Sequence, residues 1–176
     1  KKETNLGFAL YGTPSESLCN RFCKIDKEEF GLVKGITDKG YYDNSFHVSS
    51  HIKVNPFEKL RMEAPGHKYS WGGHISYIET DSLKNNLEAV YEILKYAKAV
   101  GIHYMGINQP VDKCHKCGYT GEFLATEDGF TCPQCGNHDS TQMNVIRRVC
   151  GYLSQPDARP FNSGKQKEVI ARVKHM

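Results

Sequence analysis

Apolar and polar residues alternate along the first part of the chain in a way that predicts strands interleaved with helices. The apolar run at 6–11 is bounded by glycine and predicts a buried strand. Residues 15–24 then predict a helix, and the turn between the two contains Pro14. Its apolar stripe is marked by Leu18, Phe22 and Ile25.

The next stretch carries weaker signals. Residues 45–54 alternate between polar and apolar positions, which predicts a strand. Residues 57–64 predict a short helix, and Pro65 with the following glycine is expected to stop it. Three histidines in this half of the chain, His47, His51 and His74, are interpreted as structural or exposed, with a site role for His74 as the alternative.

The clearest pattern is a strand, a helix and a second strand. Residues 75–79 predict the first strand and residues 102–107 the second. Between them, Asp81 is a good helix N-cap and Gly101 supplies the C-terminal stop. One helix between two strands predicts a crossover that leaves the strands parallel. The helix repeats its apolar residues at helical spacing: Leu83, Leu87, Val90, Ile93, Leu94 and Ala97.

Composition divides the chain into three expected parts. Residues 1–110 form an α/β portion, residues 111–142 a cysteine-rich and glycine-rich module, and residues 143–176 a loop followed by a C-terminal helix. That last helix spans about 164–175. Its basic residues Lys165, Lys167, Arg172 and Lys174 are expected to face solvent, with Val169, Ile170 and Val173 facing inward.

Charge and length exclude some classes of protein. The 176 residues carry a net charge of +3 with 24% charged residues, which is too mild to argue for nucleic acid. No apolar run approaches the roughly 18 residues of a membrane span, and no signal-peptide pattern opens the sequence. The seven cysteines are an odd number without a secretion signal. We therefore expect reduced thiols, a bound metal and a cytosolic protein.

The turn before the first helix has the chemistry of a phosphate site. A helix N-terminus offers free N–H groups and the positive end of the helix dipole. Thr13, Ser15 and Ser17 add hydroxyl donors. The alternative is an ordinary capped helix, in which Thr13 and Glu16 form a capping box.

Four cysteines form two C-x-x-C pairs, each followed by a glycine. Cys114 and Cys117 precede Cys132 and Cys135, with fourteen residues between the pairs. This spacing is typical of a closed, structural zinc site in a zinc ribbon, with residues 120–131 as the hairpin. Iron and a redox role are alternatives, and His115 and His138 are less favoured substitute ligands.

The stretch after the module contains Gly151, flanked by apolar and aromatic residues. Without a side chain, the α-carbon of glycine can become planar. A radical left there by removal of an α-hydrogen is then shared with the adjoining amide groups. Local composition favours a turn glycine instead. A metal module just before this residue would brace the chain that presents it.

The sequence resembles the C-terminal part of anaerobic (class III) ribonucleoside-triphosphate reductases, which are glycyl radical enzymes, and looks closest to the T-even phage type. Residues 148–152 look like the family motif Arg-Val-x-Gly-Tyr. Residues 159–162 after this loop belong to the same match, and three further matches lie in the family's order: residues 11–16, residues 73–77 and the cysteine quartet.

The resemblance implies a fold and a chemistry. The fold is the C-terminal part of a ten-stranded α/β barrel, to which a zinc ribbon and a radical loop are appended. A separate activase that uses S-adenosylmethionine and a [4Fe–4S] cluster would make the radical at Gly151. That radical would form a thiyl radical on a cysteine elsewhere in the reductase, which then reduces ribonucleoside triphosphates to deoxyribonucleoside triphosphates with formate as reductant.

The resemblance also limits what this chain can do by itself. The family's thiyl cysteine lies upstream of the matched stretches, and Cys19 and Cys23 are interpreted as ordinary buried thiols. We therefore expect the chain to act with the remainder of a reductase chain, as a homodimer in the host or cell cytoplasm, and to be inactive without it. A zinc-ribbon module for nucleic acid and another type of glycyl radical enzyme are the alternatives.

Overall fold

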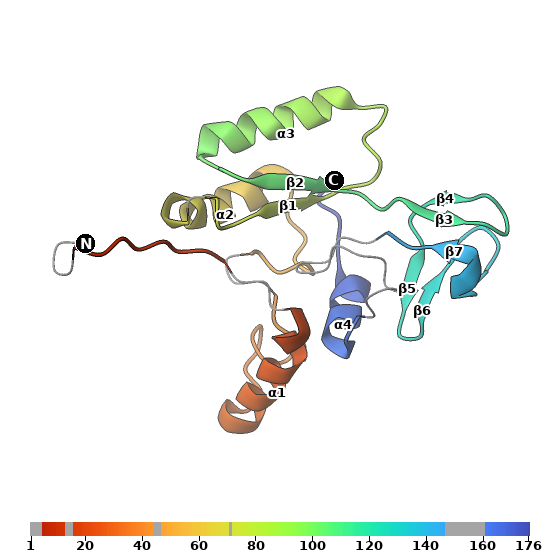
Figure 1. The fold of residues 1–176 in the computed structure, drawn as a ribbon, viewed down its shortest axis with the longest axis horizontal. Coiled ribbons are helices and arrows are strands. Elements are labelled where there is room, and N and C mark those ends of the chain that lie inside the picture. The colour runs from red at the N-terminus through yellow and green to blue at the C-terminus, as the bar shows by residue number, and fades with distance from the viewer. Residues whose placement is uncertain (1–4, 13–15, 44–46, 71, 147–160) are drawn as a thin grey trace.

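The computed structural model describes residues 5–12, 16–43, 47–70, 72–146 and 161–176. Its central unit is a pair of parallel strands joined by a helix (Figure 1). Strand β1 spans Ser76–Glu79 and strand β2 spans Met105–Asn108, in a register that pairs Ser76 with Met105. The predicted strand–helix–strand unit is confirmed, including the parallel pairing.

Helix α3, Leu87–Val100, connects the two strands and lies along one side of them (Figure 1). It begins later than predicted, because the side chain of Asn86 caps it by accepting the Ala89 N–H at 3.2 Å. The expectation that Asp81 is the N-cap is wrong. The predicted stop is confirmed, since Gly101 takes a left-handed conformation with φ of 85° that favours glycine.

Helix α2, Pro56–Tyr69, is longer than the sequence indicated. Asn55 and Glu58 form a capping box at its start. The helix continues through Pro65, so the predicted stop there is wrong. An internal proline costs a helix about 3 kcal/mol, and the helix carries it because its inner face is held against β1 by buried Leu60 and His67.

The core of this unit is small and lies between α2, α3 and the strands. It consists of Leu60, Ile78, Ile93 and Ala97, each at most 3% exposed. The predicted apolar stripe of α3 is only partly buried. Ile93 and Ala97 face the core, whereas Leu87 and Leu94 are exposed.

Two predicted strands are not found among the described residues. Residues 6–11 are extended away from the rest of the molecule with exposed apolar side chains, and they pair with no strand among the described residues (Figure 1). Their end is held by one backbone bond, from Gly12 N–H to the Gly73 carbonyl at 2.5 Å. The described part of the other stretch, 47–54, contains no strand. Period-two patterns become strands only where a neighbouring strand pairs with them.

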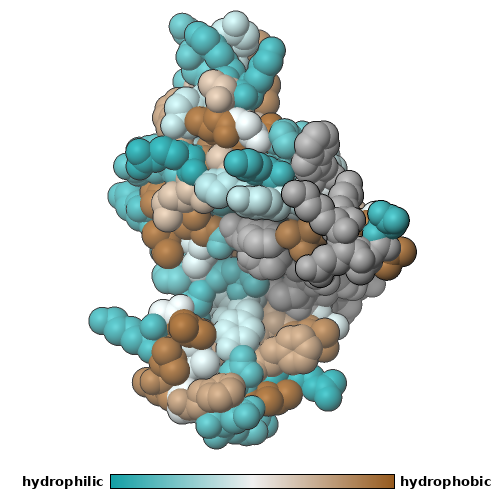
Figure 2. All heavy atoms as spheres, turned by 90° about the vertical axis from the view of Figure 1, so that its left-hand side faces the viewer, coloured by the Kyte–Doolittle hydropathy of each residue, from teal (hydrophilic) through white to brown (hydrophobic). Residues whose placement is uncertain are grey.

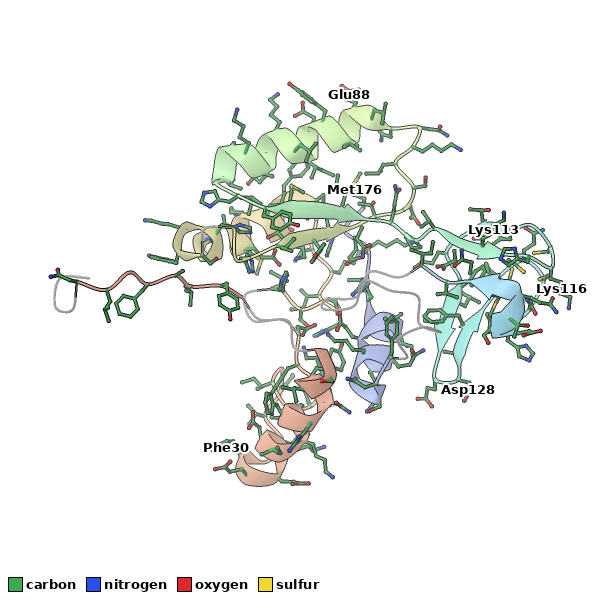
Figure 3. All side chains as sticks on the ribbon, in the orientation of Figure 1. Phe30, Glu88, Lys113, Lys116, Asp128 and Met176 are labelled. Atoms are coloured by element: carbon green, nitrogen blue, oxygen red, sulfur yellow. The ribbon has the colours of Figure 1, made fainter. Side chains whose placement is uncertain are left out.

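The first helix lies where it was predicted but buries a different face. A short 3₁₀ turn, Glu16–Leu18, leads into helix α1, Cys19–Phe30. Cys19 and Cys23 are buried, as expected, against α4 and the following loop. The apolar stripe of Leu18, Phe22 and Ile25 is 41–48% exposed. Phe30 projects from the far end of the helix (Figure 3).

The cysteine-rich part forms two small sheets. The first contains β3, Asp112–Cys114, between β4, Thr120–Gly121, and β7, Met143–Asn144. The second is the hairpin of β5, Leu124–Thr126, with β6, Gly129–Thr131, which confirms a hairpin between the knuckles. A 3₁₀ turn, Ser140–Gln142, precedes β7.

Helix α4, Ser163–Ala171, packs against α1 and the β5–β6 hairpin (Figure 1). Its predicted orientation is partly wrong. Lys165 is fully buried and its Nζ donates to the Glu168 carboxylate at 2.7 Å, while Ile170 is 44% exposed. The ion pair with Glu168 makes burial of a lysine possible.

Candidate metal centre and the segments beside it

Four cysteine side chains converge between the two small sheets. Cys114 ends β3, Cys117 follows in the same tight turn, and Cys132 and Cys135 form the second knuckle after β6. All four Sγ atoms lie within 4.8 Å of one another. Figure 3 shows their sulfur atoms gathered near Lys113 and Lys116, at the end of the module.

The spacing of the sulfur atoms fits a tetrahedral metal ion. Cys114 and Cys135 place their Sγ atoms 3.8 Å apart, and the Sγ atoms of Cys117 and Cys132 are 3.7 Å apart. Four sulfurs at the usual Zn–S bond length of about 2.3 Å, arranged tetrahedrally, lie about 3.8 Å from one another. The residues therefore fit a closed Cys₄ zinc site.

Both knuckles are built by the same backbone turn. In the first, the Gly118 N–H donates to the Cys114 carbonyl at 2.9 Å, and in the second the Gly136 N–H donates to the Cys132 carbonyl at 2.9 Å. The two glycines have φ of 78° and 68°, a conformation that other residues rarely adopt. This explains why a glycine follows each C-x-x-C pair.

The thiols differ in how readily they ionise. Burial raises the pKa of Cys114, but the backbone N–H groups of Cys117 and Lys116, with side-chain contacts from Cys117 and Asn137, bring it down to about 6. The Tyr119 N–H lowers the pKa of Cys117, whereas burial and its hydrogen bonds with the other three cysteines raise it to about 12. The Cys114 thiol therefore ionises readily, whereas ionisation of the Cys117 thiol is unfavourable unless a bound cation offsets the negative charge.

A compact apolar cluster supports the cysteines. Phe123 is 1% exposed, and Phe130, Met143 and Val145 are each at most 9% exposed. Phe161, which follows the Gly151 segment in the sequence, also packs against this cluster, and its ring centroid lies 6.4 Å from that of Phe130. The cluster is too small to fold alone, which is the usual setting for a structural metal.

Gly151 lies outside the described residues, but the segments on both sides of 147–160 are described. On the entry side, Val145 is 4% exposed and belongs to the apolar cluster. On the exit side, Asn162 caps α4 by accepting the Lys165 N–H at 2.9 Å. Asn162 also accepts a contact from the Cys19 thiol of α1 at 3.5 Å. The segment is therefore bounded by the cysteine module on one side and by the module and α1 on the other.

The predicted phosphate turn is only partly described. Thr13 and Ser15 lie outside the described residues, and with them the capping box that Thr13 was expected to form. Ser17 is exposed in the 3₁₀ turn that precedes α1. Among the described residues no side chain caps α1.

A group of three histidines, of which His67 and His74 are buried and His47 is partly buried, was not predicted as a group. The rings of His67 and His74 lie 4.5 Å apart, and His47 lies 4.9 Å from His74. Glu63 accepts the Val48 N–H at 2.9 Å and pairs with Lys59 in the same region. The signal in the sequence is the spacing of four between Lys59, Glu63 and His67, which places them on one helix face.

Burial keeps these histidines neutral. It lowers the pKa of His47 and of His67 to about 4, and it lowers the pKa of His74 as well. The Nε2 of His67 shares a hydrogen bond with Ser76 Oγ at 2.9 Å. The interpretation of His47 and His74 as structural residues agrees with these surroundings, and His51 is exposed.

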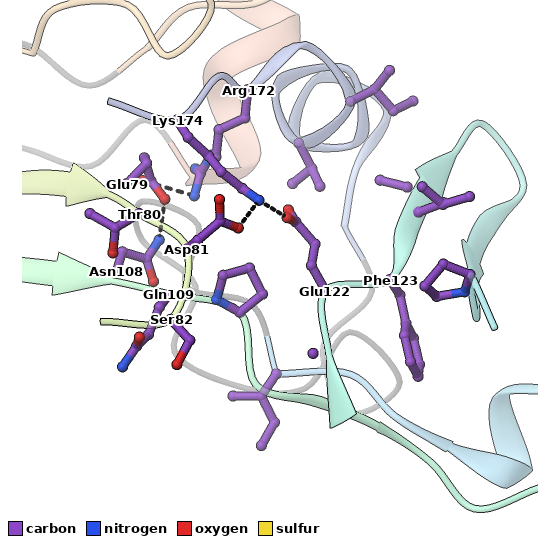
Figure 4. Close-up of a pocket in the computed structure, with 18 of the residues that line it drawn as sticks. Glu79, Thr80, Asp81, Ser82, Asn108, Gln109, Glu122, Phe123, Arg172 and Lys174 are labelled. Carbon is purple, nitrogen blue, oxygen red and sulfur yellow. Dashed lines mark hydrogen bonds and ion pairs between the residues drawn. The ribbon is translucent and has the colours of Figure 1, made fainter. Parts of the chain in front are cut away.

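A pocket of about 760 Å³ lies between the carboxyl ends of β1 and β2 and the cysteine module (Figure 4). Arg172 reaches Glu79 at 3.1 Å, and Lys174 bridges Asp81 and Glu122. The C-terminal residues thereby connect the α/β part with the module through opposite charges. Among the described residues no helix is long and apolar enough to cross a membrane.

Comparisons with known proteins agree along the whole chain. A family model described as anaerobic ribonucleoside-triphosphate reductase matches residues 1–175. The chain is 54% identical over all 176 residues to the anaerobic ribonucleoside-triphosphate reductase of Escherichia coli K12, of which it covers 25%. It is 53% identical over 174 residues to that of Enterobacteria phage T4, covering 99% of this chain and 29% of the phage protein.

Solved structures give the same fold. An anaerobic ribonucleotide reductase superposes with a TM-score of 0.69 at 20% identity, over 98% of this chain and 26% of that one. The enzyme from Thermotoga maritima with glycerol in the active site gives 0.61 at 20% identity, over 97% of this chain and 25% of that one. The chain spans about a quarter of the length of the curated relatives from E. coli and Salmonella typhimurium. From the family match over residues 1–175 and the identity to these relatives, the chain belongs to the anaerobic ribonucleoside-triphosphate reductase family.

Proposed function

We propose that this chain is the C-terminal portion of an oxygen-sensitive reductase that converts ribonucleoside triphosphates to deoxyribonucleoside triphosphates by radical chemistry. The observation that carries the proposal is 54% identity over every residue of the chain to a reductase of that name. In this proposal residues 1–110 form part of a ten-stranded barrel, residues 111–142 a zinc ribbon, and residues 143–176 the radical loop and C-terminal helix.

Gly151 would be the radical store. A separate activase, using S-adenosylmethionine and a [4Fe–4S] cluster, would remove one hydrogen atom from its α-carbon. During turnover this carbon would take a hydrogen atom from a cysteine thiol elsewhere in the reductase and leave a thiyl radical. The thiyl radical would remove the 3′ hydrogen of the ribose. The 2′ hydroxyl would then leave as water while formate supplies two electrons and becomes carbon dioxide.

The cysteine quartet would hold zinc in a structural role. Zinc with four thiolates has no open coordination position, so it orders the surrounding chain and does not bind substrate. The sulfur spacing of 3.7–3.8 Å supports this assignment. The module stands directly before the segment that contains Gly151, so an ordered ribbon would fix where that segment begins.

Substrate phosphates would bind at the turn before α1, through Thr13, Ser15 and Ser17. The exposure of Ser17 beside a helix start supports the location. The hydroxyls would donate hydrogen bonds to phosphate oxygens, and the first backbone N–H groups of the helix would add to them.

The remainder of a reductase chain would cover surfaces that this chain leaves exposed. The 3₁₀ turn, helix α1 and the loop after it expose large apolar side chains, and so does α3: Leu18, Phe22, Phe30, Leu32 and Leu87. Figure 2 shows apolar side chains among the charged ones on the face toward which the N-terminal segment points. In this proposal the remainder of the reductase covers these exposed apolar side chains. Activase, homodimer partner and a cytoplasmic location belong to the same proposal.

The experiment uses the complete reductase activated without oxygen by its activase. We expect an electron spin resonance doublet from the glycyl radical together with formate-dependent formation of deoxyribonucleotide. The Gly151→Ala variant should lose both, because an α-carbon with a methyl substituent cannot serve as the same radical site. A doublet that persists in Gly151→Ala would refute the assignment.

A further inference from the structure

Asp112 is a buried carboxylate that joins three parts of the cysteine module. It is the first residue of β3 and is 0% exposed. Its Oδ2 accepts the Phe123 N–H at 2.8 Å, and its Oδ1 accepts the Ile146 N–H at 3.0 Å. Phe123 belongs to the apolar cluster of the module, and Ile146 is the last described residue before the segment that contains Gly151.

The strand places this carboxylate on the same side as a cysteine of the quartet. Successive side chains of a strand point to opposite faces, so Asp112 and Cys114 share one face of β3. Their burial agrees, since both are 0% exposed while Lys113 between them is exposed. A cysteine of the candidate metal site and the acceptor for Ile146 are therefore fixed on one short, rigid element.

The side chain of Asp112 accepts a backbone N–H just beyond the end of the β3–β7 pairing. Strand β7 pairs with β3 through Lys113 with Asn144 and Cys114 with Met143. The backbone pairing of β3 with β7 stops there. The bond that follows is from the Ile146 N–H, two residues beyond β7, to the side chain of Asp112 in β3. A side-chain oxygen thus replaces a backbone acceptor at the point where the chain leaves the module.

We propose that Asp112 is a positioning residue for Gly151: it transmits the geometry of the metal-bound ribbon to the start of the radical segment. This inference rests on the proposed function, because it assumes that Gly151 carries the radical. A carboxylate suits the task because it offers two acceptor oxygens and no donor, and one oxygen accepts the Phe123 N–H while the other accepts the Ile146 N–H. Hydrogen bonds to a charged acceptor are also stronger than neutral ones.

The Asp112→Asn variant removes this property with little change in shape. An amide has one acceptor oxygen, and its NH₂ group would face an N–H donor, so at most one of the two bonds can remain. The matched control is Asp139→Asn. Asp139 also accepts a backbone N–H, from Thr141 at 3.0 Å, but it lies at the exposed turn before β7 and does not bond to residue 146.

The experiment measures three quantities in the complete reductase: zinc per chain, amide hydrogen exchange at Ile146 and Phe123, and glycyl radical per chain after activation. For Asp112→Asn we expect zinc to remain at one per chain. We expect exchange to be faster by about tenfold or more at Ile146, or at Phe123 where the amide oxygen keeps the Ile146 N–H, the scale of losing a hydrogen bond to a buried charged group. The radical per chain should fall by severalfold, and Asp139→Asn should match the wild type in all three.

A second variant covers the case in which Asp112→Asn does not fold. Asp112→Glu keeps the charge and both acceptors but displaces them by one methylene, and we expect intact zinc with a reduced radical yield. A wild-type radical yield in whichever of the two variants folds and retains zinc would overturn the inference, as would loss of zinc from both. Absence of the doublet in the wild-type reductase would instead refute the proposed function.

Discussion

The cysteine module and the α/β part bury their apolar residues to very different extents. In the module, Phe123, Phe130, Met143 and Val145 are all nearly buried around the cysteine quartet. In the α/β part, most large apolar residues of α1 and of its flanking segments are exposed, and the core between α2 and α3 contains four residues. The module therefore closes upon itself once a metal joins its ends. The α/β part has surfaces that remain to be covered.

The largest effect is expected from breaking the closure of the module. Replacing Cys132 and Cys135 together by serine removes two of four ligands, and a structural zinc contributes on the order of 10 kcal/mol to folding of such modules. We expect loss of the metal and of the ordered ribbon. Elemental analysis and circular dichroism measure both. Metal that survives the double substitution would rule out these ligands.

Two neighbouring residues of α3 measure the incomplete burial of the α/β part. Ile93 is 1% exposed and Leu94 is 47% exposed. Ile93→Ala should lower the free energy of unfolding by about 2–5 kcal/mol, because it empties space in the core. Leu94→Ala should cost about 1 kcal/mol or less in this chain by urea unfolding.

The Ile93→Ala and Leu94→Ala variants can also be compared in the complete reductase. If another part of the reductase covers the outer face of α3, Leu94→Ala should become markedly more destabilising there than in this chain. An equally small cost in both settings would mean that this face stays exposed to solvent.

The helix that follows the radical segment offers a third test. Lys165 is fully buried and pairs with Glu168. Lys165→Met removes one of the two cations paired with the buried Glu168 and leaves Arg172, so we expect a loss of about 3 kcal/mol in the free energy of unfolding. Lys167→Met, an exposed position on the same helix, is the control and should change it by about 0.5 kcal/mol or less. Equal losses from both variants would contradict the assigned burial.

A further prediction concerns pH and the α/β part. Burial lowers the pKa of His47, His67 and His175 to about 4, below the ordinary value of 6.5. The unfolded chain therefore binds more protons than the folded chain between pH 6.5 and 4. The stability contributed by these neutral histidines is complete above pH 6.5 and declines as pH falls toward 4.

Thermal unfolding at pH 7 and pH 5 measures this dependence, with a lower midpoint expected at pH 5. His47→Gln removes one titrating group and should weaken the pH dependence. A midpoint that is unchanged or higher at pH 5 would contradict the assignment of these histidines as buried and neutral.

The sequence predicted those features whose cause is local. The spacing of the cysteines and their glycines placed the knuckles, and Gly101 placed the end of α3. Both depend on backbone conformations that a few neighbouring residues determine.

The features that the sequence missed depend on distant partners. Lys165 is buried because α4 packs against α1 and the β5–β6 hairpin, and α2 continues through Pro65 because β1 packs against its inner face. The stretch 6–11 has the composition of a strand but meets no strand among the described residues. Asp112 stood outside every motif, and its two N–H partners come from residues 11 and 34 positions later. Contacts over such separations follow from the fold and not from local pattern.

X-ray absorption at the zinc edge, on protein purified without oxygen, tests the central claim most directly. That claim is that a four-thiolate metal site orders the module before Gly151. We predict one zinc per chain with four sulfur neighbours at about 2.3 Å. Oxygen or nitrogen neighbours in place of sulfur, or protein that folds without metal, would contradict it.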